Sequence, residues 1–174
     1  MAVSLVSPPI SPAMRTRPQG FTLIELMVVI GVIAILALLT LPGIQDKLVR
    51  DQIVESARLS DVAKAQVAAA WARDQLMPAN NTAAGLPSPD KMVGNFVKAV
   101  EVEGGAIHLR FGQKANAALR DKTLSFRPAI VTGEALVPIA WVCGRAAVPT
   151  PMAAQGSDRT DLPDNLLPLN CRPR

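Results

Sequence analysis

The hydrophobic and polar positions of this chain form three successive patterns. Residues 21–41 are almost entirely apolar, and Glu25 is the one charged side chain among them. Residues 43–77 carry apolar side chains at helical spacing, and the residues from Pro78 onward alternate turn-rich segments with the apolar/polar alternation of strands. The patterns predict an α+β fold, in which a long N-terminal helix packs on an antiparallel sheet of about four strands.

The apolar run is long enough to cross a membrane. As a helix it would extend for roughly 31 Å, which matches the hydrocarbon core of a bilayer, so we expect a hydrophobic membrane helix over residues 21–42. A cleaved secretory signal peptide is the alternative, but its apolar region is shorter and ends at a small-residue cleavage site that is missing here. Arg15 and Arg17 are the only charges before the run and favour a cytoplasmic N-terminus.

The residues before the run are predicted to be a leader. Residues 1–20 are rich in Pro and Ser and show no periodicity. Met14 stands just before both arginines, so the true start could be Met14 rather than Met1.

After Pro42 the pattern predicts an amphipathic continuation of the helix over residues 43–77. Glu55 is its main misfit, and Pro42 should kink or loosen the helix. We expect one long, interrupted helix from Phe21 to about Met77. Its predicted apolar face comprises Ile44, Leu48, Val49, Leu59, Val62, Ala63, Val67 and Ala70.

The remaining residues, 78–174, are predicted to form a loop, a sheet and an irregular tail. A hairpin should turn at Gly104-Gly105, and segments 122–130 and 137–144 should supply two more strands. Pro128 and Pro138 suggest edges or bulges rather than central strand positions. Residues 144–174 show no convincing strand and are predicted to be an irregular loop.

Cysteine usage and charge restrict the function further. Cys143 and Cys171 are the only cysteines. If the domain is exported, a disulfide between them is expected, and two buried free thiols are the alternative. The net charge is +4, and Arg15 and Arg17 belong to the leader, so a basic nucleic-acid surface is not indicated.

No catalytic or metal-binding constellation is recognisable, and we expect a non-enzyme without a cofactor. The single histidine, His108, is predicted to be a solvated strand residue, and Asp158, Asp161 and Asp164 lack the spacing of an EF-hand and should be solvated. Trp71 and Trp141 are predicted to pack in the core. The tripeptide Asn80-Asn81-Thr82 fits a glycosylation acceptor but is common by chance.

The stretch "GFTLIELMVVIGVIAILALLTLP" closely resembles the N-terminus of type IV pilins, particularly the type IVa class. Gly20 precedes Phe21, Glu25 is the fifth residue after that junction, and Pro42 is the twenty-second. The segments "NNTAAG", "FVKAVEVEGG", "KTLSF", "WVCG" and "LPLNCR" also look like pilin segments. No tyrosine follows the proline, however, and the leader is long for the class unless Met14 is the start.

The resemblance implies a processing and assembly route. A prepilin peptidase would cut between Gly20 and Phe21, and the new amine of Phe21 would be methylated. Subunits would wait in the inner membrane until an ATP-driven inner-membrane machine stacks copies of the chain into an extracellular filament used for adhesion, twitching motility or DNA uptake. A carboxylate in an apolar helix needs a partner charge, and we expect Glu25 to pair with the Phe21 amine of a neighbouring copy.

Several alternatives to a major pilin remain open. The chain could be a minor pilin, or a pseudopilin of a type II secretion system, although the two cysteines argue against a pseudopilin. It could also be a membrane-anchored enzyme or a DNA receptor. DNA binding would require Arg110, Lys114 and Arg120, and nothing in the charge balance supports it.

Overall fold

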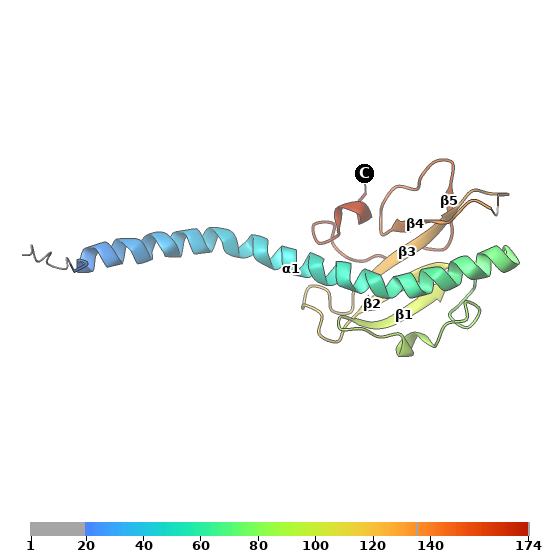
Figure 1. Ribbon diagram of the computed structural model, residues 1–174, viewed down its shortest axis with the longest axis horizontal. Coiled ribbons are helices and arrows are strands. Elements are labelled where there is room, and N and C mark those ends of the chain that lie inside the picture. Colours follow the sequence, from blue (N-terminus) through green and yellow to red (C-terminus); the bar gives the residue numbers. More distant parts are fainter. Residues whose placement is uncertain (1–19, 135, 174) are drawn as a thin grey trace, which may run out of the picture. The chain divides into compact units, whose positions relative to one another are not determined.

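The computed structural model describes residues 20–134 and 136–173, without the side chains of residues 40–44. Backbone contacts divide the chain into two compact units, of which the first ends at Leu41 and the second begins at Pro42. The predicted leader, with Met14, Arg15 and Arg17, lies outside the described residues except for Gly20. The second unit contains all of the strands (Figure 1).

The helix α1 spans Leu23–Asp74, close to the predicted range. The helical backbone passes through Pro42, so a break in the helix at this residue is wrong, whereas a kink or local loosening there stays a prediction. Proline lacks one N–H and so removes a single hydrogen bond of the helical ladder. The turns on either side keep theirs, which is sufficient for the helix to continue.

The buried stripe of α1 differs from the predicted apolar face. Leu48 and Val62 were expected on that face, yet they are 56% and 55% exposed. Two serines replace them in the stripe, and each satisfies its hydroxyl locally: Ser56 Oγ donates to the carbonyl of Gln52 over 2.7 Å, and Ser60 Oγ to that of Ala57 over 2.6 Å. The small side chains let the sheet approach the helix closely. The buried positions recur alternately four and three residues apart, at Val49, Ile53, Ser56, Ser60, Ala63, Val67 and Ala70.

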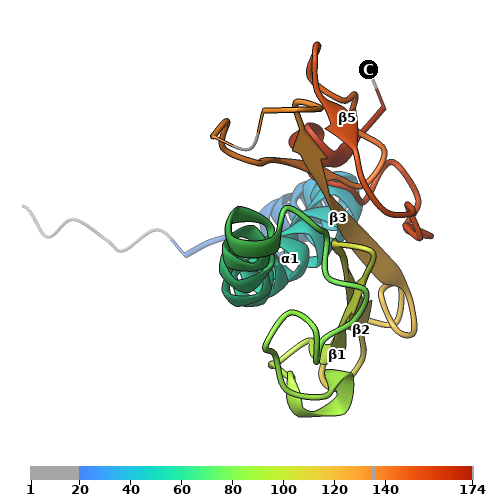
Figure 2. The same cartoon turned by 90° about the vertical axis from the view of Figure 1, so that its right-hand side faces the viewer.

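The sheet is antiparallel and has the order β1-β2-β3-β4, with the short β5 also paired to β3. The predicted hairpin is confirmed, since β1 and β2 flank Gly104 and Gly105, whose φ angles of 55° and 82° match a type I′ turn. Figures 1 and 2 show the helix lying along one face of this sheet. The strands are β1 (Val97–Glu103), β2 (Ala106–Phe111), β3 (Thr123–Ile130), β4 (Ala140–Cys143) and β5 (Ala153–Ala154).

Pro128 was predicted at an edge or a bulge; it lies within β3, an interior strand of the sheet order, at a point where β3 has a paired residue on one side only. It pairs with Trp141 of β4 on one side. On the other side, the pairing of β2 with β3 has already ended at Phe126, so the missing N–H of proline breaks no ladder bond there. Pro138 lies outside the strands, before β4.

The C-terminal tail is more ordered than predicted. It contributes β5 and the 3-10 helix η2 (Leu169–Cys171), and four of its side chains join the core between helix and sheet: Leu162, Leu166, Leu167 and Cys171. A two-residue strand is too short to produce a visible alternation, which is why the sequence pattern missed it.

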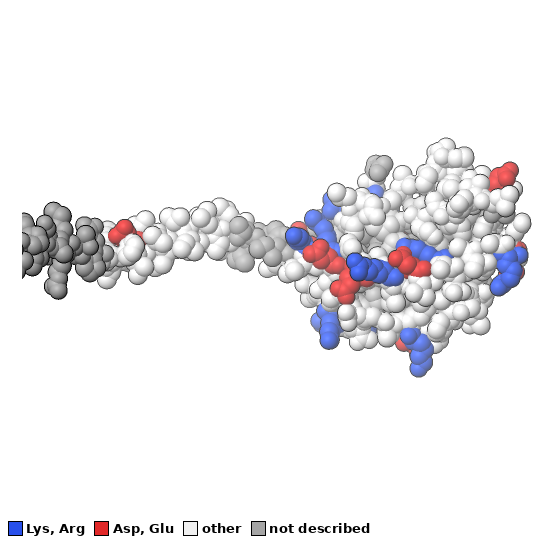
Figure 3. All heavy atoms as spheres, viewed as in Figure 1, with Lys and Arg blue, Asp and Glu red and all other residues white. Residues whose placement is uncertain are grey.

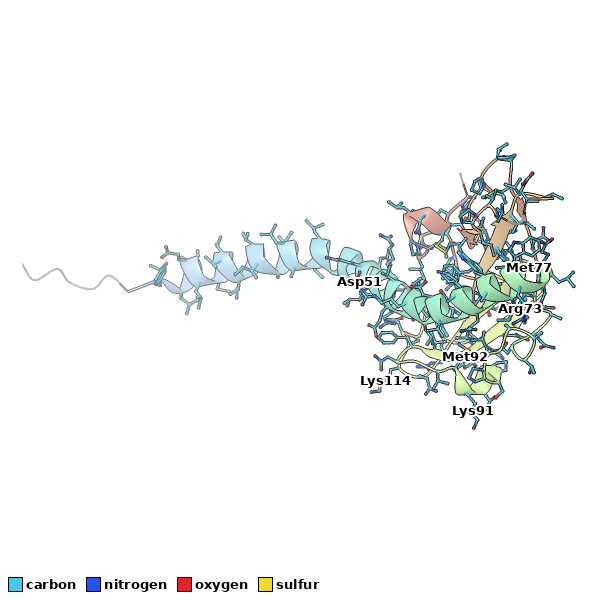
Figure 4. All side chains as sticks on the ribbon, turned by 45° about the vertical axis from the view of Figure 1, so that its right-hand side comes forward. Asp51, Arg73, Met77, Lys91, Met92 and Lys114 are labelled. Atoms are coloured by element: carbon cyan, nitrogen blue, oxygen red, sulfur yellow. A yellow bond between two sulfur atoms is a disulfide. The ribbon has the colours of Figure 1, made fainter. Side chains whose placement is uncertain are left out.

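The connection between α1 and β1 packs along the free edge of β1. It contains the 3-10 helix η1 (Pro89–Lys91) and the buried Asn81. At the hairpin turn, Gly105 N–H donates to the carbonyl of Pro78 over 2.9 Å. A Cβ on Gly105 would lie 2.8 Å from the sulfur of Met77, which follows the C-terminal end of the helix (Figure 4), so only glycine fits this turn.

Candidate functional site

The N-terminal half of α1 presents apolar side chains on every side. The large apolar residues from Phe21 to Leu39 are between 48% and 84% exposed, including Phe21 at 84% and Leu39 at 74%. A helix that is hydrophobic all round is stable only when something else covers it, such as a lipid bilayer or other helices. This segment is therefore an interaction surface that the chain cannot bury by itself.

The first turn of this helix is built by a Thr-x-x-Glu arrangement. Thr22 Oγ1 accepts a 3.2 Å hydrogen bond from the backbone N–H of Glu25, and the Thr22 carbonyl accepts one from Leu26 N–H. Threonine thus acts as the N-cap, and glutamate occupies the third helical position, as in a capping box. Sequence reasoning missed this role of Thr22, although its spacing to Glu25 was a readable signal.

Glu25 is exposed and has no ion-pair partner among the described residues. It is the single charged side chain of residues 21–41. On the face seen in Figure 3, the described part of the apolar half-helix is white apart from acidic atoms near its N-terminal end. A carboxylate in the first turn is favoured by the partial positive charge of the helix N-terminus. That interaction stabilises the helix but leaves the negative charge uncompensated on an apolar surface.

Gly20 and Phe21 precede the helix and are both exposed. None of the described residues lies within 4 Å of where a Cβ on Gly20 would be. The backbone on both sides of the Gly20–Phe21 bond is thus outside any regular element. Cleavage and methylation at this junction stay predictions.

Pro42 belongs to the five residues whose side chains lie outside the description, so its predicted part in assembly stays a prediction. The parts of α1 that the structure describes contain no stretch combining the length and the apolarity that crossing a bilayer requires. The predicted span over residues 21–42 includes Thr40, Leu41 and Pro42, whose side chains lie outside the description.

Cys143 and Cys171 form a disulfide, with an S–S distance of 2.00 Å. It joins the end of β4 to η2, and both half-cystines are buried in the core. A backbone hydrogen bond joins the same two segments, since Arg145 N–H donates to the carbonyl of Cys171 over 3.1 Å. The predicted disulfide is confirmed, and it fastens the end of the tail to the sheet.

His108 is buried, so its prediction as a solvated strand residue is wrong. Its side chain points to the face of the sheet opposite α1, but only 2% of it is exposed because the tail covers that face. Gly156 packs there so closely that a Cβ would lie 2.6 Å from that of Ala106. The guanidinium of Arg159 reaches across the strands to Glu101 and Glu103 of β1, at 3.2 and 3.1 Å.

The surroundings of His108 have the members of a serine–histidine–carboxylate triad but not its chemistry. His108 Nδ1 lies 2.9 Å from Ser125 Oγ, and Nε2 lies 3.6 Å from Glu103 Oε2. Ser125 is fully buried and its hydroxyl already accepts the N–H of Arg159, so no substrate carbonyl can reach it. Burial, followed by the positive charge of Arg159, lowers the pKa of His108, so the ring is neutral near pH 7.

The three tail aspartates are engaged separately. Asp158 accepts a hydrogen bond from Thr160 N–H, Asp161 accepts one from Thr123 N–H, and Asp164 pairs with Arg145. None of the described acidic, histidine or cysteine residues form a cluster able to hold a metal ion.

The two tryptophans are half-buried rather than central to the core. Trp141 packs against the core, whereas Trp71 does not belong to it. Together they line a cavity of about 350 Å³ beside Leu136, Val137 and Pro138. The indole N–H of Trp71 is buried there and has no hydrogen-bond acceptor among the described residues.

Arg110, Lys114 and Arg120, the residues on which DNA binding would depend, lie on β2 and in the loop that follows it. Arg110 and Arg120 both act on the carboxyl of Asp121, whose pKa falls chiefly because Lys98 donates a hydrogen bond to it. This part of the surface is thus of mixed charge.

Comparison with known proteins agrees with this architecture. A family model described as Pilin (bacterial filament) matches residues 49–172, and one described as Prokaryotic N-terminal methylation motif matches residues 15–41. The chain is 35% identical over 165 residues to a type IV major pilin protein PilE1 of Neisseria gonorrhoeae, covering 91% of this chain and 89% of that protein.

Further relatives carry similar names. A fimbrial protein of Neisseria meningitidis serogroup B is 32% identical over 168 residues, covering 91% of this chain and 96% of its own length. The fimbrial protein EcpC of Eikenella corrodens is 40% identical over 84 residues, which cover 48% of this chain and 54% of that protein. The chain therefore belongs to the pilin family of bacterial filament proteins.

Proposed function

We propose that this chain is a structural subunit of a type IV pilus, polymerised through the N-terminal half of α1. The observation that carries the proposal is the apolar half-helix, exposed on every side and bearing the single carboxylate of Glu25. Stacked copies would cover this surface with one another, and the folded unit from Pro42 onward would form the outside of the filament. The role is structural rather than catalytic.

Processing would supply the charge that Glu25 lacks. Cleavage after Gly20 creates an amine on Phe21, which stays cationic after methylation. Between apolar helices the effective dielectric is low, so pairing this amine with Glu25 of a neighbouring copy is favourable and also fixes the axial register. Before assembly the subunit would be held in the inner membrane, where prepilin peptidase and the assembly machinery act on it.

The type II secretion pseudopilin is the runner-up, and the disulfide between Cys143 and Cys171 speaks for the pilus subunit. The uses of the filament, in adhesion, motility or DNA uptake, belong to the proposal as expectations.

Substitutions at Glu25 test the proposal because they separate charge pairing from helix capping. Glutamine can occupy the third position of a capping box as well as glutamate can, but it carries no charge. If charge pairing drives assembly, Glu25→Gln and Glu25→Ala should both yield processed subunits. Each variant should form at least about tenfold fewer filaments than the wild type, counted by electron microscopy. Wild-type filament numbers from Glu25→Gln would contradict the pairing.

Thr22 provides the matched control. Thr22→Ser retains the cap and Thr22→Val removes it, at a cost of about 1 kcal/mol in helix stability. Both variants keep Glu25 and should assemble, with Thr22→Val impaired only slightly.

A further inference from the structure

A second cavity lies on the face of the sheet opposite α1, away from the apolar half-helix. Its volume is about 370 Å³, within the range of small-ligand sites. It lies beside the covered His108, and the half-buried Ala99 leaves room for it. Its lining residues are Pro89, Ala99, Glu101, His108, Arg110, Asp121, Thr123 and Arg159.

The lining alternates hydrogen-bond donors with acceptors. The guanidinium groups of Arg110 and Arg159 provide fixed donors, and the carboxylates of Glu101 and Asp121 accept. The hydroxyl of Thr123 can do either. A ligand that satisfies such a set must itself carry several donors and acceptors, as a polyhydroxylated molecule does.

His108 forms part of the cavity wall, but its Nε2 has almost no exposed surface and lies 3.6 Å from Glu103 Oε2, so a ligand cannot reach it. Arg110 is the charged lining residue that forms no ion pair with the described residues, whereas Arg159 is held by Glu101 and Glu103, and Asp121 by Lys98. The uncommitted charge in the cavity is therefore positive.

We propose that this cavity binds an acidic sugar residue, with the sugar carboxylate on Arg110 and the hydroxyls on Glu101, Asp121 and Thr123. A simple anion such as phosphate fits the lining less well, because Glu101 and Asp121 repel it and offer it no donor. A neutral sugar would satisfy the acceptors but would leave Arg110 unpaired. Only a ligand with both hydroxyls and a carboxylate uses every group.

The test is a titration of the full chain in detergent, which needs no filament and therefore succeeds or fails independently of pilus assembly. The probes are methyl β-D-glucuronide, methyl β-D-glucoside and inorganic phosphate, followed by calorimetry and ligand-observed NMR. We expect the glucuronide to bind with a dissociation constant of about 1 mM and the other two at least about tenfold more weakly, since the charge-assisted pair with Arg110 is missing or opposed.

Three variants locate the site. Arg110→Gln should weaken glucuronide binding about tenfold, and Ala99→Val should abolish it by filling the cavity. Arg110 is exposed and Ala99 half-buried, and circular dichroism checks that both variants are folded. Lys114→Gln changes an exposed charge in the loop after β2 (Figure 4), which does not line the cavity, and should bind as the wild type does.

Three results would overturn the proposal. The first is that the wild type does not bind the glucuronide, and the second is that it binds phosphate or the glucoside equally well. The third is that folded Arg110→Gln or Ala99→Val binds the glucuronide as the wild type does.

Discussion

The side chain of Asn81 caps the open edge of the sheet by accepting a 2.7 Å hydrogen bond from the backbone N–H of Val102. Its Nδ2 also donates to the carbonyl of Val100 over 2.9 Å. Because β1 is the last strand on this side of the sheet order, these backbone groups have no neighbouring strand to pair with. One buried amide thus takes the place of a strand and protects an edge that could otherwise pair with another chain.

Asn81→Ala should therefore destabilise the folded unit by about 2–4 kcal/mol, since it leaves two buried backbone groups unpaired. Urea denaturation of the chain in detergent, followed by the far-UV signal, measures the change.

Asn80→Ala is the control one residue away. Asn80 is exposed and its side chain accepts one hydrogen bond from Ala83 N–H, so its loss should cost about 1 kcal/mol or less. Equal costs for the two variants would show that the edge contact of Asn81 contributes nothing special.

The disulfide should be a main support of the tail. Cys143→Ser opens the loop that ends at Cys171 and should lower the free energy of unfolding by about 3–4 kcal/mol. The double variant Cys143→Ser/Cys171→Ser should be no less stable than the single one. If the single and the double variant both melted at the temperature of the oxidised wild type, the disulfide would be dispensable for stability.

The stability of the folded unit should fall between pH 7 and pH 5 because of His108. Burial and the charge of Arg159 outweigh the attraction of Glu101, Glu103 and Asp158 and lower the pKa of His108 below 6.5. The unfolded chain therefore takes up its proton at a higher pH than the folded chain does, and the free energy of unfolding decreases as pH falls below about 6.5. His108→Gln should abolish this slope in denaturation curves measured from pH 7 to 5.

The carboxylates with a lowered pKa do not produce that slope. The pKa values of Asp74, Asp90 and Asp121 are all lowered, so the stability that they contribute is lost at lower pH, around and below their ordinary values. A slope of wild-type size in His108→Gln would show that other groups are responsible.

Processing should depend on Gly20 alone among the residues at the junction. Gly20→Val should leave an uncut chain in the membrane fraction, visible by its full mass. Because none of the described residues packs against this position, a failure to be cut should report on recognition by the peptidase and not on folding. Gln19→Val, one residue away, should be cut normally, and normal cutting of Gly20→Val would refute the processing site.

Local periodicity was sufficient to predict the helix, the hairpin and most of the strands. It failed where distant segments meet. The burial of His108 depends on Gly156 and Arg159, which lie far along the chain and cover a face that the alternation marks as exposed. The prediction of the buried face of α1 failed for a related reason. Ser56 and Ser60 are polar residues, and they can be buried because their hydroxyls donate hydrogen bonds to the preceding helical turn.

The residues of the candidate site differ in how far the sequence alone predicts their roles. Glu25 stands out as a charge in an apolar segment, so its sequence position alone indicates a function. Thr22 is an ordinary residue whose capping contact becomes visible only with the helix start at Leu23. The cavity beside His108 could not be predicted, because its walls come from η1, β1, β2, β3, the loop before β3 and the tail, which only the fold brings together.

The most direct test of the central claim is mass spectrometry of the subunit in filaments sheared from the cell surface. We predict that these filaments contain this chain, that its N-terminal peptide begins at Phe21, and that this peptide carries one extra methyl group. Filaments that lack the chain, or a subunit that still contains Gly20, would contradict it.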